Sequence, residues 1–508
     1  MCTLLFLRRI LLYPHIIFIH RCSIGFAAPA LPPGQRRRIV LTQAIPSRSD
    51  FSQGSISQAI FRQAGPMTVA LLVNMLYSVV DRIYLGHIPG EGRLALTGIG
   101  LAFPIIAVIS AFQRLCSDGG APLCAMARGA GELERAETIQ GNAYTLLLLF
   151  SLLLIALGYA FKAPILWATG AGEATFPYAD AYLRIYLVGT IFVLPSLGMN
   201  AFITGQGFPT VSMMTVLLGA VVNILLDPLF IFVFDMGVRG AALATVIAQF
   251  TSFLWVLLFL TSHRAILRLR LSRMRLQRNI VLPMLGLGLT GFTMSVTNSA
   301  VGMVYNASLQ TLGGDLYVGV MTVVNSIREI IYMPVSGLTA GAQPVISFNY
   351  GARCYSRTKE AIRLFTRYSF IYAGSVWALL MLLPQAFIGV FNGDAALLDA
   401  GVPALRIYYC LFFCMAFQIA GQHTFVAVGR SRHAIFFSLL RKVILVIPLV
   451  YLLPKLLPWG AIAVFLSEPI SDLIGGTASY LAMRASVWKE LCRLEALEPS
   501  HGPASDPV

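Results

Sequence analysis

The sequence predicts an all-α protein that crosses a membrane repeatedly, and three observations support this prediction. The chain has 508 residues, of which 57% are hydrophobic and only 12% are charged. That charged fraction is about half of the roughly 25% found in soluble domains. Apolar segments of about 20 residues, each long enough to span roughly 30 Å of hydrocarbon, recur along the chain. A β-barrel is disfavoured because its strands would be about 10 residues long and would alternate in polarity.

Apolar windows between loop signals predict twelve transmembrane helices. They cover residues 61–84, 94–116, 139–161, 181–204, 210–233, 240–261, 281–311, 316–346, 362–383, 400–427, 434–456 and 460–483. We expect two six-helix lobes. The predicted boundaries are 1–55 for an N-terminal extension, 56–262 for the first lobe, 263–279 for a basic cytoplasmic linker, 280–485 for the second lobe and 486–508 for a cytoplasmic tail. Residues 1–50 fit either a signal-like segment or a poorly ordered extension.

Basic residues between the spans predict the orientation. Six arginines lie within 263–278, and further basic residues lie at 353–359 and 430–432, all on one side of the membrane. The opposite loops, such as GHIPGEG and TLGGD, contain few basic residues, so the arginine-rich side and both termini are expected to be cytoplasmic. We expect the protein to be located in the inner (cytoplasmic) membrane. The net charge of +15 then reflects topology and contact with anionic lipid, and it requires no nucleic-acid partner.

One constant shift in residue number, the shift that carries residue 183 onto residue 405, aligns matching positions in the two halves. This shift is called the repeat offset below. It carries LRIY at 183–186 onto LRIY at 405–408. Glycine, proline and alanine positions also return at this offset: Gly119, Pro122, Gly129, Ala130 and Gly207 match Gly341, Pro344, Gly351, Ala352 and Gly429, and after a drift of two positions Gly240-Ala241 matches Gly460-Ala461. Six spans per half give both halves the same orientation, so we expect a pseudo-twofold axis along the membrane normal. This plan is typical of a two-lobed alternating-access transporter.

A polar stripe runs along the first predicted span. Asn74, Tyr77, Ser78 and Asp81 stand at positions i, i+3, i+4 and i+7, on one helical face. A charge at the centre of a membrane helix costs at least about 2.5–3.5 kcal/mol, so an inward-facing ion or proton site is the functional interpretation. The alternative is that Asp81, beside Arg82, is a solvated helix end.

The fifth and sixth spans supply a second polar cluster. Asn223 and Asp227 share a face in VVNILLDPLF, and Thr245 and Gln249 share a face in the following span. Asp227 with Pro228 could instead end a helix at the interface, and Thr245 could bond to its own backbone. Together, the carboxylates, amide and hydroxyl offer oxygen ligands for a hard cation, or two acids that share a proton. A Na⁺ ion here would be the only metal we expect.

The repeat indicates that these acids belong to the N-terminal lobe alone. Moving Asp81, Asn223 and Asp227 by the repeat offset gives only apolar positions. These are Met303, Leu445 and Leu449. Pro66 removes a backbone hydrogen bond and permits a bend in the first helix, although a proline in a first turn has no such effect. Three acids in the second half are interpreted as paired or interfacial: Glu329, Glu468 and Asp472.

Sequence motifs for enzyme chemistry are absent. The eight cysteines show no CxxC spacing, and the chain has no HExxH or GxSxG motif. A membrane-embedded enzyme would need a nucleophile, base or metal cluster at membrane depth. We therefore expect no enzymatic activity and no organic cofactor.

Several stretches carry a resemblance to a known family. They are NMLYSVVDRIYLGHIPG, SDGGAPLCAMARGAGELERAETI, GQGFPTVSMMTVLLGAVVNILLDPLFIFVFDMGVRGAALATVIAQ and GLTAGAQPVISFNYGA. Over roughly residues 55–485 the chain resembles the prokaryotic branch of the multidrug and toxic compound extrusion (MATE) family. The resemblance implies two six-helix lobes, a central cleft and export driven by inward flow of Na⁺ or H⁺. An acid pair that some relatives carry in the seventh span is absent from NSAVGMVYNASLQ, which agrees with the repeat.

The resemblance also implies roles for individual residues. Asp81, Asn223, Asp227 and Thr245 match coupling-cation positions, Pro66 matches the helix-bending proline, and Asn74 and Asn200 match cleft positions. Together with Tyr77 and Gln249, the cleft residues Asn74 and Asn200 define an expected binding cleft for bulky, amphipathic, often cationic compounds. We expect a monomeric antiporter of small molecules embedded in membrane lipid. A lipid-linked oligosaccharide flippase of the same superfamily stays open, and it would need several cationic groups in the cleft.

Overall fold

The computed structural model describes residues 51–391 and 395–497. Residues 1–50, the last eleven residues and 392–394 lie outside the described part, and with them lie most of the predicted N-terminal extension and the end of the predicted tail. All regular elements in the described part are helices. This confirms the predicted all-α class.

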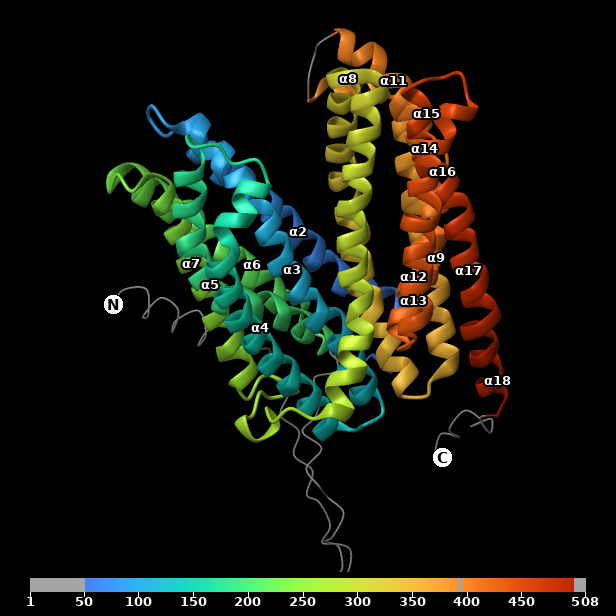
Figure 1. The fold of residues 1–508 in the computed structure, drawn as a ribbon. Coiled ribbons are helices and arrows are strands. Elements are labelled where there is room, and N and C mark those ends of the chain that lie inside the picture. Colours follow the sequence, from blue (N-terminus) through green and yellow to red (C-terminus); the bar gives the residue numbers. More distant parts are fainter. Residues whose placement is uncertain (1–50, 392–394, 498–508) are drawn as a thin grey trace, which may run out of the picture. The chain divides into compact units, whose positions relative to one another are not determined.

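The first bundle contains the first six predicted spans (Figure 1). Its elements are α2 (Ile56–Gly86), α3 (Gly92–Gly129), α4 (Leu133–Ala168), α5 (Phe176–Gly205), α6 (Pro209–Pro228), the π-helix η1 (Leu229–Val233) and α7 (Gly237–Thr261). The helices are longer than the predicted windows because they continue past the apolar core. Their buried side chains include many alanines and glycines, which allow close approach of helices in the membrane.

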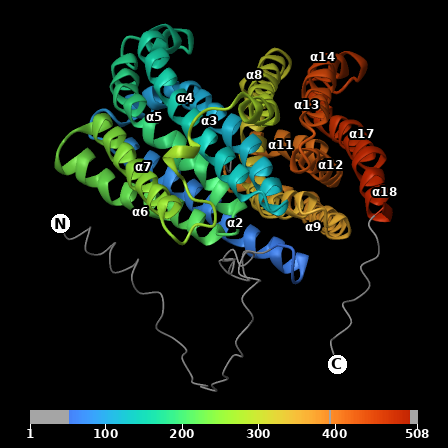
Figure 2. The same ribbon diagram turned by 90° about the horizontal axis from the view of Figure 1, so that it is seen from below.

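The second bundle contains the other six spans, several of which are broken (Figures 1 and 2). Its first elements are α8 (Arg278–Gly351), α9 (Tyr355–Leu382), α10 (Pro384–Gly389), α11 (Ala395–Tyr409), η3 (Phe412–Cys414) and α12 (Met415–Ala427). The remaining elements are α13 (Ser431–Leu439), η4 (Leu440–Val446), α14 (Ile447–Leu456), α15 (Ile462–Phe465), α16 (Ser467–Ser471), η5 (Asp472–Gly476), α17 (Thr477–Met483), η6 (Arg484–Trp488) and α18 (Lys489–Leu497).

The described helices account for twelve crossings. Nine of the described helices, counted as continuous helices, are long and apolar enough to span a membrane. One of these, α8, consists of two spans that meet at Gly314, whose backbone angles (φ 66°, ψ −162°) only glycine adopts readily. The last two crossings are α9, which is less apolar than these nine helices, and the series α15 to η6, which is broken into short pieces. The predicted number of spans is therefore confirmed.

The internal repeat appears in the backbone as well as in the sequence. Gly207 and Gly429, which are related by the repeat offset, both have a positive φ, of 92° and 79°. Gly131 and Arg353 are related by the same offset and have φ values of 78° and 60°. Because positive φ is uncommon outside glycine, its recurrence at one offset indicates that the same turns are built twice.

Glycines bring helices of the two halves into close contact in a symmetric pattern. A Cβ atom on Gly119 of α3 would collide with the backbone of α8 at Met284, and one on Gly341 of α8 would collide with the backbone of α2 at Ala64. Likewise Gly129 and Gly351, on α3 and α8, each face the other helix's backbone. The repeat-related glycines therefore serve the same purpose, and each half contributes one to the contact between halves.

The basic linker is packed against the first bundle. Its short 3₁₀ helix η2 spans Leu271–Arg273. The backbone N–H of Leu267 donates to Gln206 (3.0 Å), the N–H of Gln277 donates to Asn142 (2.8 Å), and Arg270 pairs with Glu137 (3.4 Å). The linker is thus held at one end of α4 and α5. The boundaries of the two lobes around it stay a prediction.

Candidate functional site

The predicted coupling residues come together in the first bundle, from three helices. Asp81 lies on α2, Asn223 and Asp227 lie on α6, and Thr245 lies on α7. The Asn223 side-chain amide donates to Asp227 Oδ1 (3.1 Å) and lies 3.5 Å from Thr245 Oγ1. The carboxyl groups of Asp81 and Asp227 are near enough for their charges to interact. The structure thus brings the predicted coupling residues together, and their role in coupling stays a prediction.

This cluster has more acceptors than donors. Asp227 is fully buried and Asn223 is 2% exposed. Four buried oxygen atoms accept no hydrogen bond: Asp81 Oδ1, Asn223 Oδ1, Asp227 Oδ2 and Gln249 Oε1. Among the residues that the structure describes, neither carboxyl has an ion-pair partner. Buried acceptors without donors are costly, and a bound cation or proton satisfies them.

Local structure explains why Asp227 is buried. The helix does not end at the Asp227-Pro228 pair, as a proline signal could suggest, but continues through it into η1. Pro228 lacks an N–H, and the wider π-helical turn follows directly. The pair therefore lies inside a span, and the alternative of an interfacial helix end is not what the structure contains.

The structure also separates the two interpretations of Asp81 and Pro66. Asp81 is partly buried, whereas Arg82 is exposed and lies over the ring of Phe103, 5.1 Å from its centroid. The two neighbouring charges therefore point in different directions. Pro66 lies well inside α2 and not in its first turn. It thus removes a hydrogen bond from the helix interior, where that loss permits bending.

The predicted cleft residues lie around a small cavity next to this cluster. Asn74, Tyr77 and Gln249 line a space of about 20 Å³ together with Asn223 and Thr245. This volume holds about one water molecule or small ion. The fourth predicted residue, Asn200, lies elsewhere, with its amide 3.4 Å from the Ser212 carbonyl. The space at these residues is large enough for a single small ion and too small for a bulky compound.

Two tyrosines near the acids escaped the sequence interpretation. Tyr182 and Tyr186 on α5 are buried, and their rings stack at 5.7 Å. Tyr182 lies near Asp81 and near the hydroxyl of Thr245. Tyr182 directly precedes the repeated LRIY motif and Tyr186 is its last residue, but that motif was used only to align the two halves. Their hydroxyl groups are donors that could serve the orphaned acceptors when the cluster is deprotonated.

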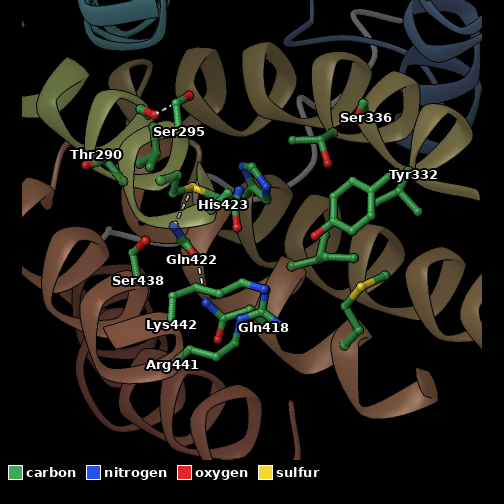
Figure 3. Close-up of a pocket in the computed structure, with 18 of the residues that line it drawn as sticks. Thr290, Ser295, Tyr332, Ser336, Gln418, Gln422, His423, Ser438, Arg441 and Lys442 are labelled. Carbon is green, nitrogen blue, oxygen red and sulfur yellow. Dashed lines mark hydrogen bonds between the residues drawn. The ribbon is translucent and has the colours of Figure 1, made fainter. Parts of the chain in front are cut away.

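The second bundle contains a buried charge network of a different kind, whose basic members Arg441 and Lys442 are labelled in Figure 3. Arg441 and Lys442 lie on the π-helix η4, and Asp472 begins the π-helix η5. Arg441 pairs with Asp472, and Lys442 pairs with Glu468 (2.6 Å). Every acid in this network therefore has a basic partner. Glu468 and Asp472, which were interpreted as paired or interfacial, are thus each paired with a basic residue.

The basic members of this network could have been found from the sequence. Arg441-Lys442 interrupts the apolar run of the eleventh span, which is itself a signal of an intramembrane site. Further along the network, Arg328 contacts the Tyr408 hydroxyl (3.4 Å), and Tyr305 contacts Ser467 (2.6 Å). Glu329, predicted as paired or interfacial, is exposed.

A large cavity of about 630 Å³ lies beside this network. That size is typical of sites for drug-sized ligands. Its wall includes Leu71, Arg114 and Asp118 from α2 and α3 as well as residues of the second bundle, so helices of both halves contribute. Figure 3 shows Gln418, Gln422 and His423 among the side chains that line it. Gln418 donates to Gln422 (2.5 Å), whose amide in turn reaches the sulfur of Met294 (2.9 Å).

Comparison with known proteins agrees with this architecture. The MatE family model matches residues 66–229 and 292–452, which include α2 with Asp81, α6 with Asp227 and the corresponding spans of the second half. The chain belongs to the MatE family. The resemblance noted in the sequence is thereby confirmed, and the chain is a multi-pass membrane protein like other members of this family.

Individual MatE proteins are similar along most of the chain. The multidrug export protein MepA of Staphylococcus saprophyticus is 24% identical over 433 residues, covering 85% of this chain and 94% of its own. A transporter of the MOP superfamily from Pyrococcus furiosus superposes with a TM-score of 0.81 at 22% identity, covering 89% of this chain and 99% of its own. A MATE structure in the bent conformation has a TM-score of 0.83, with the same identity and coverage.

Proposed function

We propose that this MatE protein is an antiporter that exports amphipathic, often cationic organic compounds in exchange for inward-moving H⁺ or Na⁺. The observation that supports it best is the buried pair Asp81 and Asp227, which has no basic partner among the described residues. Two like charges about 4 Å apart repel by about 4 kcal/mol at an effective dielectric constant of 20. The cluster therefore favours an added positive charge, either a proton shared by the acids or a cation held by their oxygens.

The location of this pair suggests how the ion is coupled to movement. Asp81 and the helix-interior Pro66 belong to the same helix, α2, whose first part packs into the core of the second bundle through Ile56 and Ile60. Neutralising Asp81 changes the electrostatic interaction between α2 and α6, and Pro66 allows α2 to respond by bending. A helix that contacts both bundles is suited to transmit ion binding into alternating access.

The compound itself fits the larger cavity better than the space beside the acids. The 630 Å³ cavity is within the usual range for organic ligands, whereas the 20 Å³ space holds one ion. The large cavity offers apolar and thioether surface from Phe412, Met294 and Met415, which adapts to varied shapes. The names of the MepA relatives support multidrug export. We therefore propose broad specificity.

The driving force for export depends on how much net charge the exchange moves across the membrane. A membrane potential contributes about 2.3 kcal/mol per charge per 100 mV, roughly a fiftyfold concentration ratio. One imported cation exchanged for one monovalent cationic compound moves no net charge. Export of such a compound should depend on the ion gradient and not on the potential, whereas export of a neutral compound should depend on both.

Transport by purified protein in proteoliposomes tests the proposal. The assay follows efflux of a monovalent cationic dye under an imposed H⁺ gradient or Na⁺ gradient, each with and without a potential set by K⁺ and valinomycin. We expect efflux with one of the two gradients and no effect of potential. Thr97→Ala is a control, since this exposed hydroxyl on α3 lies outside the cluster and bonds the Arg93 carbonyl (2.9 Å). Gradient-independent dye movement would refute coupling.

The flippase alternative is favoured by one observation, the four basic residues in the wall of the large cavity. They are Arg114, Arg328, Arg441 and Lys442. Four acids in the same wall balance them, namely Asp118, Glu329, Glu468 and Asp472. A diphosphate needs an excess of positive charge, so we rank this function second. Transbilayer movement of a lipid-linked diphosphate sugar in the same proteoliposomes would reverse that ranking.

The orientation and assembly are also proposals. The described chain begins and ends on the arginine-rich side, because Arg357 binds the Phe51 carbonyl (3.1 Å) and Lys359 pairs with Glu495 near the last described helix residues. This supports cytoplasmic termini in an inner membrane. We also propose that the protein is a monomer and that, like the multidrug export proteins to which it is similar, it is a transporter and not an enzyme.

A further inference from the structure

A separate pocket lies at the arginine-rich end of the second bundle, away from both sites described above. It has a volume of about 240 Å³ and lies between α9 and the α17–η6 segment. Its wall is formed by Ile362, Arg363, Thr366, Arg367, Tyr480, Met483, Arg484 and Trp488. The volume corresponds to roughly eight water molecules at about 30 Å³ each, enough for a polar group larger than one ion.

The charge of this pocket is uniformly positive. Arg363, Arg367 and Arg484 line it, and no acidic residue does. All three arginines are exposed, and none forms an ion pair within the part of the chain that the structure describes. Glu490 and Glu495 on the neighbouring helix α18 pair with Arg430 and Lys359. Glu360, one turn before Arg363 on α9, does not line the pocket. Three guanidinium groups thus surround one space without a counter-charge from the protein.

Aromatic packing holds two of these arginines in place. The Arg484 guanidinium lies 4.5 Å from the ring centroid of Trp488, and that of Arg363 lies 5.7 Å from the same ring. The segment from Arg484 to Trp488 is the π-helix η6, a rare geometry that often marks functional positions. Arginines stacked on a ring keep their N–H edges free, and that edge geometry matches phosphate oxygens.

The surface next to the pocket is apolar and faces outward. Ile371 follows Arg363 and Arg367 at the same four-residue spacing, so it continues their face of α9, and it is 56% exposed. On α17, Leu481 is three residues before Arg484 and is 59% exposed. The pocket therefore lies where basic side chains give way to a lipid-facing surface, and Trp488 is the residue type that favours this boundary.

We propose that this pocket binds an anionic glycerophospholipid, with its phosphate on Arg363, Arg367 and Arg484 and its acyl chains along Ile371 and Leu481. Basic pockets between transmembrane helices on the cytoplasmic side recognise such headgroups. The lack of any acid in the wall selects against a zwitterionic lipid, whose ammonium group the arginines would repel. The exposed side chains of Ile371 and Leu481 favour a lipid over free phosphate, because inorganic phosphate has no acyl chain to contact them.

Native mass spectrometry of the purified full-length protein tests this site. Protein stripped of lipid in detergent is titrated with phosphatidylglycerol, with phosphatidylcholine, or with phosphatidylglycerol plus millimolar inorganic phosphate. We expect one tightly bound phosphatidylglycerol, much weaker phosphatidylcholine binding, and no displacement by phosphate. The triple variant Arg363→Gln, Arg367→Gln, Arg484→Gln should weaken phosphatidylglycerol binding by about tenfold or more.

A matched triple variant controls for general loss of positive charge. Arg62→Gln, Arg432→Gln and Arg493→Gln remove three exposed arginines at the same end of the protein that do not line the pocket. This variant should bind phosphatidylglycerol like the wild type. If the pocket triple fails to fold, Arg367→Gln alone should still weaken binding. Equal binding of both lipids, displacement by inorganic phosphate, or equal loss in the two triples would each overturn the proposal.

Discussion

The first lobe holds the partly buried Asp81 and the buried Asp227 without an ion-pair partner among the described residues, whereas the second lobe buries Glu468 and Asp472 against Lys442 and Arg441. Both clusters lie inside membrane spans, and both adjoin π-helical turns: η1 follows Asp227, and η4 and η5 carry the second cluster. The difference is the source of the compensating charge. In the second lobe the protein supplies it, and in the first lobe it must come from outside.

This difference predicts different behaviour during transport. A cluster that is neutral by itself is most stable when left intact, because removing one member leaves a buried charge without a partner. A cluster that lacks its counter-charge can gain and lose an ion at moderate cost. In the proposed antiport the first lobe would therefore bind and release the driving cation, and the second lobe would keep its charges fixed beside the large cavity.

The largest expected effect is at the acids of the first lobe. Asp81→Asn keeps the size and polarity of the side chain but removes the charge that attracts the cation. Gradient-driven dye efflux should fall more than tenfold, to the level of empty liposomes, while expression and thermal stability in detergent stay near wild type. Efflux at the wild-type rate would mean that Asp81 is a helix-end residue and that the lobes do not differ in this way.

An effect on stability and not on coupling is expected in the second lobe. Lys442→Met removes the 2.6 Å partner of Glu468, which then keeps only its 3.5 Å contact with Arg441, and should lower the free energy of unfolding by up to about 3–5 kcal/mol. The double variant Lys442→Met, Glu468→Gln removes both charges and should recover most of that loss. Unfolding of purified protein measures this. A double variant as unstable as the single one would show that the charges do not form a self-contained pair.

The smallest effect is expected where the repeat replaces the acids by apolar residues. Met303→Leu and Leu449→Met conserve volume at the positions that the repeat offset relates to Asp81 and Asp227, and such exchanges usually cost less than about 1.5 kcal/mol. The number of cations exchanged per compound should be unchanged. It is measured from the ion gradient at which net compound movement stops. A changed stoichiometry in the Met303 variant would place coupling in the second lobe.

The sequence predicted the spans, the repeat and the first-lobe cluster because each leaves a periodic or intramembrane signal. Helical spacing placed Asn223 beside Asp227, and the repeat offset anticipated the repeated turns at Gly207 and Gly429. The breaks at η4, η5 and η6 were not predicted, since a π-turn needs no particular residue. The partners of Glu468 were missed because they lie on a different span, and sequence spacing does not report contacts between helices.

Binding of the driving ion to purified protein tests the central claim most directly. The measurement is the uptake of Na⁺ at fixed pH, or of protons on acidification in weakly buffered detergent solution, by wild type, Asp227→Asn and the double variant Lys442→Met, Glu468→Gln. If the uncompensated acids of the first lobe form the ion site, the binding event is lost in Asp227→Asn and retained in the double variant. Retention in Asp227→Asn, with loss in the double variant, would contradict this account.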